Sequence, residues 1–148
     1  MTNANDTDQL AILTFRVGQQ YYALPIMNVL EVAAMMTLTQ VPNAPAAMLG
    51  IANRHGRALS MLDLRIAFKM KIHTIDETTL FIVAQADERV VGLVVDDIYP
   101  VIYIAPENRQ TIVGTSRYLT HAISTHQQLY QQIDLPALCD DHLAPVQP

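Results

Sequence analysis

The residues whose types and spacing could support catalysis gather in one stretch, IANRHGRALSMLDLR, at residues 51–65. It contains a histidine, a serine and an aspartate, the residue types of a nucleophilic triad, at His55, Ser60 and Asp63. Ser60, however, lies in a strand-like run and lacks the G-x-S-x-G elbow that exposes a nucleophile. His55 could act as its base only by folding back over a turn, and a base also needs a third group to orient it. An enzyme built on this stretch is therefore not favoured.

The first part of the stretch has the composition of a hairpin turn. Gly56 adopts positive φ angles freely, and an asparagine such as Asn53 hydrogen-bonds its own backbone locally. Strands are therefore expected on both sides of this turn, and Asp63-Leu64-Arg65 is expected to end the second strand.

Metal and two-acid chemistry lack the spacing that they need. His121 and His126 are five positions apart, which suits neither one face of a helix nor the H-E-x-x-H motif. Asp96 and Asp97 are adjacent, so on a strand they would point to opposite faces instead of sharing a site. The remaining histidines have no ligand partner at a recognisable interval: His55, His73 and His142. The sequence predicts no metal site and no cofactor.

The composition describes a globular chain with much apolar surface to bury. Of its 148 residues, 51% are hydrophobic and 16% are charged, and its one cysteine rules out an internal disulfide. The stretch MTNANDTDQ at the N-terminus lacks the features of a signal peptide, and no apolar run reaches the roughly 18 residues that span a bilayer. A net charge of −5 with scattered basic residues argues against nucleic-acid binding. We expect a cytoplasmic protein that neither binds nucleic acid nor inserts into a membrane.

Short strand patterns dominate the chain, and these elements must position any site. Apolar and polar residues alternate over residues 11–17, whereas residues 90–95 are apolar on both faces, as expected of a strand buried on both sides. Helical signals are short, and the last of them follows Asp134, a residue that can cap a helix. The pattern predicts an all-β fold with short helices, including one near the C-terminus, and flexible tails at residues 1–8 and 143–148.

An internal repeat runs through these strand patterns. Residues 22–26 align with residues 91–95 at an offset of 69, and Asp63-Leu64 aligns with Asp134-Leu135 at an offset of 71. A near-constant offset over several segments predicts two similar β units, stacked or intertwined, at about residues 12–70 and 79–139. Each unit alone would bury too little apolar surface, so the two are expected to share a core.

Binding is favoured over catalysis by the same observations. The first half is rich in methionine, a flexible apolar residue that usually fills cores but also suits partner grooves. Two kinds of binding protein stay open at this point. A protein-interaction module would need an exposed apolar groove, whereas a small-ligand-binding β-barrel would need a closed pocket with convergent polar groups.

Three stretches of the chain together resemble the CheW-type coupling proteins of bacterial chemotaxis. They are FRVGQQYYALPIMNVLEV at 15–32, VPNAPAAMLGIANRHGRALSMLDLR at 41–65 and RVVGLVVDDIYPVI at 89–102. The hallmark of that family is an N-L-R-G turn, an apolar strand and then D-L-R. These motifs stand here as Asn53-Arg54-His55-Gly56 and Asp63-Leu64-Arg65. The resemblance covers residues 10–139 and implies a single CheW-like domain.

The resemblance implies two similar five-stranded, SH3-like β-barrels packed together, in agreement with the repeat. It implies a non-enzymatic adaptor that links the cytoplasmic tips of methyl-accepting chemoreceptors to the regulatory domain of a CheA-type histidine kinase. The receptor tip, a helical hairpin, would dock into an apolar groove between the barrels. Carried over by position, the groove residues are Val29, Glu31, Gly50, Asn53, His55, Leu80, Gly92, Ile98 and Val101. Motility, pilus control and gliding all stay open as the pathway served.

One departure from the family pattern leaves two pairings open. The family's arginine before Gly56 is His55 in this chain, while Arg54 stands where leucine is usual. Either His55 or Arg54 is expected to pair with Glu31, and only the histidine would make that pair sensitive to pH near neutrality.

Overall fold

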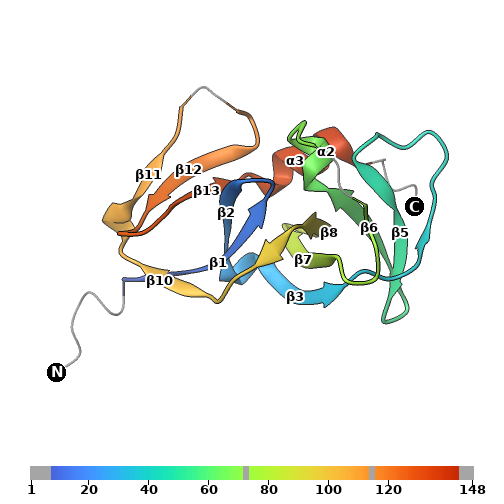
Figure 1. Cartoon of the computed structure of the whole chain (residues 1–148), viewed down its shortest axis with the longest axis horizontal. Helices are drawn as coiled ribbons and strands as arrows, with labels where there is room; N and C mark the ends of the chain where they lie inside the picture. The colour runs from blue at the N-terminus through green and yellow to red at the C-terminus, as the bar shows by residue number, and fades with distance from the viewer. Residues whose placement is uncertain (1–7, 72–73, 114–115, 144–148) are drawn as a thin grey trace.

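The computed structural model describes residues 8–71, 74–113 and 116–143 of the chain. Two curved β-sheets make up most of it, with two short α-helices near their junction (Figure 1). The elements in chain order are β1 (Leu10–Val17), β2 (Gln20–Pro25), the 3-10 helix η1 (Ile26–Asn28), β3 (Val29–Ala34), β4 (Leu38–Thr39), β5 (Met48–Arg54), β6 (Arg57–Asp63), α2 (Leu64–Ala67), β7 (Leu80–Ala86), β8 (Arg89–Val95), β9 (Asp97–Ile98), β10 (Ile102–Ile104), the 3-10 helix η2 (Pro106–Asn108), β11 (Arg109–Thr111), β12 (Leu119–Ser124), β13 (Leu129–Ile133) and α3 (Leu135–His142).

The two sheets have matching strand orders. The terminal barrel has the order β10-β1-β2-β13-β12-β11, with β9 also paired to β1, and the central barrel has the order β3-β7-β8-β6-β5-β4. In both barrels five successive strands are followed by a short edge strand, β11 in one and β4 in the other. The predicted all-β fold with two similar halves is therefore confirmed.

The boundaries of the two barrels differ from those expected from the repeat. The hairpin β1–β2 pairs with β10 and β13, while the hairpin β7–β8 pairs with β3 and β6. Each copy of the repeat thus contributes its first hairpin to the other copy's sheet. The expected division into units 12–70 and 79–139 is therefore wrong as a division into barrels. Sequence similarity reveals that two hairpins are equivalent, but it does not reveal which copy each hairpin pairs with.

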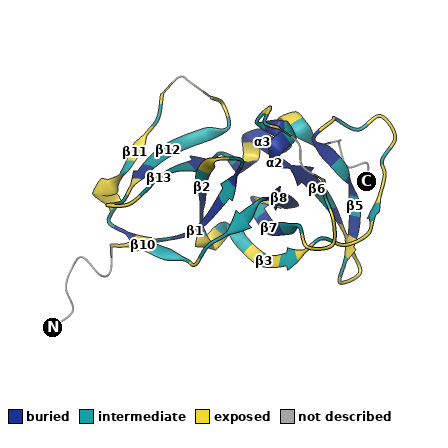
Figure 2. Ribbon diagram, viewed as in Figure 1, coloured by how far each residue is buried: buried dark blue, intermediate teal, exposed yellow. Residues whose placement is uncertain are grey.

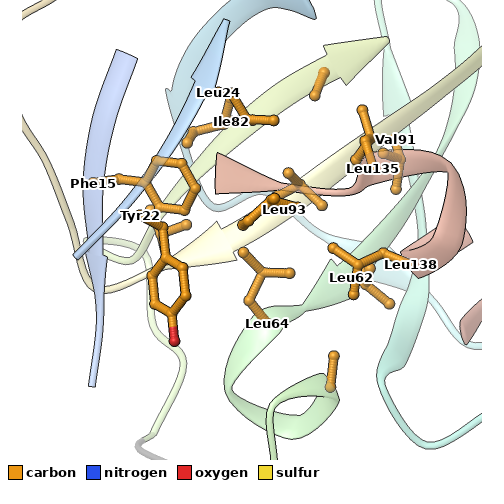
Figure 3. Packing of buried hydrophobic residues seen from close by; sticks show 14 of the residues in the cluster. Phe15, Tyr22, Leu24, Leu62, Leu64, Ile82, Val91, Leu93, Leu135 and Leu138 are labelled. Atoms are coloured by element: carbon orange, nitrogen blue, oxygen red, sulfur yellow. The ribbon is translucent and has the colours of Figure 1, made fainter. Parts of the chain in front are cut away.

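Exchange of the hairpins produces a hydrophobic cluster that both barrels share. In this shared cluster, side chains from β1, β2 and β13 meet others from β6, β7 and β8. Figure 3 shows part of it, with labelled residues from β1, β2, β6, β7 and β8. Leu64 from α2 and Leu138 from α3 are completely buried in it. A smaller cluster fills each barrel: Ala52, Leu59, Met61, Phe81, Val83 and Val94 in the central barrel, and Ile12, Ala23, Ile104 and Ile123 in the terminal barrel.

Strand β8 explains why residues 90–95 are apolar on both faces. Val91, Leu93 and Val95 enter the shared cluster, while Val94 points the other way into the central barrel. Only Val90, at the start of the strand, stays 36% exposed. Figure 2 shows the same contrast, with buried strands at the junction and exposed turns at the periphery. Burial on both faces is confirmed for all of the predicted strand except its first residue.

An aspartate directly precedes each α-helix and caps it, as expected of equivalent positions in a repeat. The carboxylate of Asp63 accepts a hydrogen bond from the backbone N–H of Arg65, and that of Asp134 accepts one from Ala137. Capping by Asp134 is therefore confirmed, and it satisfies N–H groups that lack partners within the helix. No helix in the described part of the chain is long and apolar enough to cross a membrane.

The C-terminal tail is shorter than predicted. Leu143 packs against the shared cluster, so the prediction of a flexible tail from residue 143 is wrong at that residue. Residues 1–7 and 144–148, the rest of the two predicted tails apart from the exposed Asp8, lie outside the described residues.

Candidate partner-binding site

The Asn-Arg-His-Gly stretch forms the tight turn of the hairpin β5–β6. Arg54 pairs with Arg57, which leaves His55 and Gly56 as a two-residue loop. Their φ angles are 51° and 79°, and positive values at both positions are typical of a type I′ turn. The side-chain oxygen of Asn53 accepts a hydrogen bond from the backbone N–H of Gly56 at 2.9 Å. The turn predicted from the sequence is confirmed.

Of the two basic residues in this turn, Arg54 forms the closer pair with Glu31. Its Nη2 and Nε lie 2.6 and 2.7 Å from Glu31 Oε2, whereas His55 Nε2 lies 3.5 Å from the same oxygen. The side chain of Arg54 is 23% exposed and that of His55 is 74% exposed. The hydrogen bond from Arg54 is the main reason that the pKa of Glu31 is lowered below its usual range. Arg54, and not His55, therefore forms the closer ion pair with Glu31.

The Glu31–Arg54 pair also helps to close the central barrel. Glu31 lies on β3 and Arg54 on β5, the first and fifth strands of the sheet order, which are not hydrogen-bonded to each other. An ion pair between these two strands links the ends of the curved sheet. The pair therefore shapes one end of the barrel next to the β5–β6 turn.

The D-L-R motif forms a buried ionic network at the junction of the barrels. The side chain of Arg65 is only 2% exposed, and its Nε and Nη2 donate hydrogen bonds to the carboxylate of Asp63 at 3.1 and 3.2 Å. Its Nη1 lies 3.4 Å from Asp96 Oδ1. The other carboxylate oxygen of Asp96 accepts the backbone N–H of Gly18, in the β1–β2 turn of the terminal barrel. The network thus ties β6, the end of β8 and the exchanged hairpin β1–β2 together.

Asp96 and Asp97 do not act as a carboxylate pair. While Asp96 joins this network, the Asp97 carboxylate accepts the backbone N–H of the next residue, Ile98. Both carboxylates accept a backbone N–H, but from different segments, so the two adjacent acids do not share a site.

Four apolar residues of the predicted groove gather against the shared cluster. Val29, Leu80, Ile98 and Val101 are each partly buried and pack against it. They come from β3, β7, β9 and the segment after β9, so they represent both barrels. Val29 pairs with Ala84 of β7. Each of the four retains some exposed surface at the junction.

The remaining predicted site residues divide into exposed and buried ones. Asn53 and His55 are exposed in the β5–β6 turn, and Glu31 beside them is partly exposed. Gly50 and Gly92 are buried inside the central barrel. A Cβ atom at Gly50 would lie 2.6 Å from the backbone oxygen of Thr39, and one at Gly92 would lie 2.6 Å from the sulfur of Met61. Close packing therefore explains these two glycines without a partner.

A surface that the sequence analysis missed lies on the outer face of β3. The side chains that point away from the central cluster are apolar here, and three of them are exposed: Leu30 at 46%, Val32 at 43% and Met36, just after the strand, at 38%. We call these three residues the β3 stripe. Leu30 and the exposed Val90 also line a concavity of about 450 Å³ that includes Arg54 and Arg57. The signal in the sequence is the run VLEVAAMM, which is apolar at nearly every position although β3 ends the sheet order.

Metal binding has no structural support among residues 8–71, 74–113 and 116–143. No group of three or more histidine, cysteine, aspartate or glutamate side chains in these ranges is arranged to hold an ion. His73 lies outside the described residues.

Comparison with known proteins agrees with this architecture. Residues 11–142 match the family described as the CheW-like domain. The chemotaxis protein CheW of Klebsiella aerogenes is 29% identical over 140 residues, which cover 91% of this chain and 84% of that protein. A probable chemotaxis protein CheW of Rhizobium etli is 34% identical over 96 residues, which cover 65% of this chain and 62% of that protein.

A solved structure has the same fold. The scaffolding protein TtCheW from Thermoanaerobacter tengcongensis superimposes with a TM-score of 0.80 at 22% identity, covering 86% of this chain and 90% of that one. The superposition supports the two-barrel architecture, and the family match extends from β1 to the end of α3. The chain therefore belongs to the CheW-like domain family of chemotaxis coupling adaptors.

Proposed function

We propose that this chain is a non-enzymatic adaptor that couples chemoreceptors to a CheA-type histidine kinase in the cytoplasm. The observation that carries the proposal is the set of partly exposed apolar side chains at the junction of the barrels, Val29, Leu80, Ile98 and Val101. Such side chains are suited to contact the apolar face of a helix. We infer that the tip of a methyl-accepting chemoreceptor, a helical hairpin, lies in this groove. Neither nucleic acid nor direct membrane insertion has a part in this function.

Coupling requires a second surface for the kinase. We assign the regulatory domain of the kinase to the β3 stripe, because exposed apolar side chains that lie together commonly mark protein interfaces. The stripe points outward from the central barrel, while Val29 and Leu80 pack toward the shared cluster. A partner on the stripe and a partner in the groove would therefore use different side chains.

The decisive experiment reconstitutes the complex. The full chain, the receptor hairpin and the kinase from one organism are mixed, and kinase activity is compared with and without the chain. We expect each partner to bind the chain separately and kinase activity to respond to the receptor only when the chain is present. The adaptor proposal would be rejected if the chain bound neither the receptor hairpin nor the kinase. Motility, pilus control and gliding are then distinguished by which receptor binds.

The alternative of a small-ligand-binding β-barrel has no observation in its favour. It requires an enclosed apolar cavity, yet both barrels contain buried side-chain clusters. The concavities found among the described residues, such as the one beside the β3 stripe, are open to solvent.

Replacing Arg54 with alanine should weaken receptor binding by about fivefold, in the range of a partly exposed ion pair. Binding by the parent protein should stay constant between about pH 6 and pH 8. The reason is that Arg54 lowers the pKa of Glu31, so the pair is intact above the usual carboxylate range and is lost only as pH falls through the lowered value. Titration calorimetry at several pH values measures both effects.

His55→Arg is the matched control for the Arg54 variant. It makes the neighbouring cation permanently charged and should leave affinity and pH profile close to those of the parent. Binding that strengthens toward pH 6 in the parent and becomes flat in His55→Arg would assign the role to His55 instead.

A further inference from the structure

The two barrels contain equivalent positions, and comparison of these positions singles out Arg109. In the central barrel, Leu38 of β4 pairs with Ala52 of β5, and both belong to the apolar interior. In the terminal barrel, Arg109 of β11 pairs with Ile123 of β12 at the corresponding place. The same fold thus accepts leucine where the terminal barrel has arginine. Arg109 is therefore not required by the architecture of the barrel.

A second equivalent position shows the same change. Met61 of β6 lies beside Gly92 of the parallel strand β8 and is completely buried in the central barrel. Gln132 of β13 lies beside Ala23 of the parallel strand β2 and is 7% exposed in the terminal barrel. An apolar side chain again has a polar counterpart. Two adjacent polar replacements within one barrel interior point to a use other than packing, because buried polar groups stabilise a fold less readily than apolar ones.

Arg109 and Gln132 contact each other but leave donors unused. Arg109 Nε donates a hydrogen bond to Gln132 Oε1 at 2.8 Å. The terminal nitrogens of Arg109 have no hydrogen-bond or ion-pair partner among the described residues. Elsewhere in the described chain, four arginines have a carboxylate within 4.0 Å: Arg54, Arg65, Arg89 and Arg117. Within residues 8–71, 74–113 and 116–143, Arg109 is thus a partly buried cation with no carboxylate within 4.0 Å.

His121 lies next to Arg109 and Gln132, and its pKa responds to the positive charge of Arg109. It pairs across the sheet with Gln132 on one side and Thr111 on the other, so the three side chains share a face. Its Nδ1 lies 2.8 Å from the hydroxyl oxygen of Thr120. Burial and, next, the charge of Arg109 lower the pKa of His121. The imidazole is therefore neutral near pH 7 and adds a polar wall without a second charge.

We propose that Arg109, with Gln132 and His121 beside it, forms a partly buried site that binds one aspartate or glutamate side chain of a protein partner. The proposal rests on the adaptor function, which supplies such partners. Gln132 holds the Nε side of the guanidinium, and the two terminal nitrogens remain as donors for a carboxylate. A single cation on a chain of net charge −5 suits one carboxylate, whereas binding a nucleic acid would require a cluster of cations.

The first test uses the full chain and a defined probe. The peptide Ac-Glu-Glu-Glu-NH2 is titrated while the side-chain N–H signal of Arg109 and the ring signals of His121 are followed by NMR. We expect saturable shifts in the parent and none in Arg109→Leu. That variant should fold, because leucine occupies the equivalent position of the central barrel. Lys71→Leu removes the same charge from an exposed site and should titrate like the parent. Shifts produced by inorganic phosphate but not by the peptide would overturn the carboxylate assignment.

The second test measures affinity for the receptor hairpin and for the kinase regulatory domain. Arg109→Leu should weaken binding to one of them by about tenfold or more, as expected of a partly desolvated interface arginine. Arg109→Lys, which keeps the charge but not the planar fork, should recover only part of that loss. A parent that binds both partners while Arg109→Leu binds each equally well overturns the site and leaves the adaptor function standing. If the parent binds neither partner but the peptide still shifts the NMR signal of Arg109, the adaptor function is rejected. The carboxylate site then remains supported.

Discussion

Replacing Arg65 with alanine is expected to lower the free energy of unfolding by about 3–5 kcal/mol. The guanidinium is 2% exposed and pairs with Asp63, which is 0% exposed, and with Asp96, which is 14% exposed. Removing the cation leaves two carboxylates close together with little water to solvate them, which is the costly way to break a buried ion pair. Chemical denaturation of parent and variant, followed by circular dichroism, measures the difference.

A matched surface variant separates this effect from the loss of any arginine. Arg89→Ala removes an ion pair with Asp140 in which the side chains are 41% and 55% exposed. It should cost no more than about 1 kcal/mol. Equal destabilisation by the two variants would contradict the buried network as a major contributor. Because Asp96 also accepts the backbone N–H of Gly18, Arg65→Ala should in addition increase amide exchange in the β1–β2 turn.

Replacing Val101 with glutamate is expected to weaken binding of the receptor hairpin by about 2–4 kcal/mol. Val101 is partly buried against the shared cluster, and the proposed groove places its exposed part against the receptor helix. A carboxylate there would have to be desolvated in the complex without a cation to pair with, whereas in the free chain it can turn to water. The free energy of unfolding should therefore change less than the free energy of binding.

Two control variants separate an effect on receptor binding from an effect on folding stability. Tyr103→Glu introduces the same charge two positions away, on a side chain that is 68% exposed, and should bind the receptor like the parent. Leu93→Ala alters a completely buried residue of the shared cluster and should destabilise the fold by about 2–5 kcal/mol. If Val101→Glu destabilises the chain as much as Leu93→Ala does, Val101 serves the core and its place in the groove is wrong.

Local chemistry explains which parts of the fold the sequence predicted well. The turn at Asn53 and Gly56 and the helix cap at Asp134 depend on residues within a few positions of one another. Alternating and continuous apolar runs identified strands because burial on one or two faces imposes that periodicity directly. The repeat identified two similar halves, since equivalent strands need equivalent side chains.

The site was predicted less completely because it depends on contacts between distant segments. Whether Arg54 or His55 pairs with Glu31 depended on the direction of each side chain at a type I′ turn, which residue order does not specify. Gly50 and Gly92 were expected in the groove, but they are buried inside the central barrel, where a backbone oxygen and a methionine sulfur leave no room for a Cβ atom.

Residue order alone predicted the all-β class, the twofold repeat, the β5–β6 turn and the resemblance to one family. The exchange of the hairpins β1–β2 and β7–β8 between the barrels is visible only in the folded chain, because two equivalent hairpins fit two equivalent sheets with the same local pattern. The exchange places one face of each hairpin in the shared cluster and the other inside a barrel. The fold likewise brings Arg65 to Asp96 and places no described carboxylate within 4.0 Å of Arg109, since charges far apart in sequence are paired only when the fold brings them together.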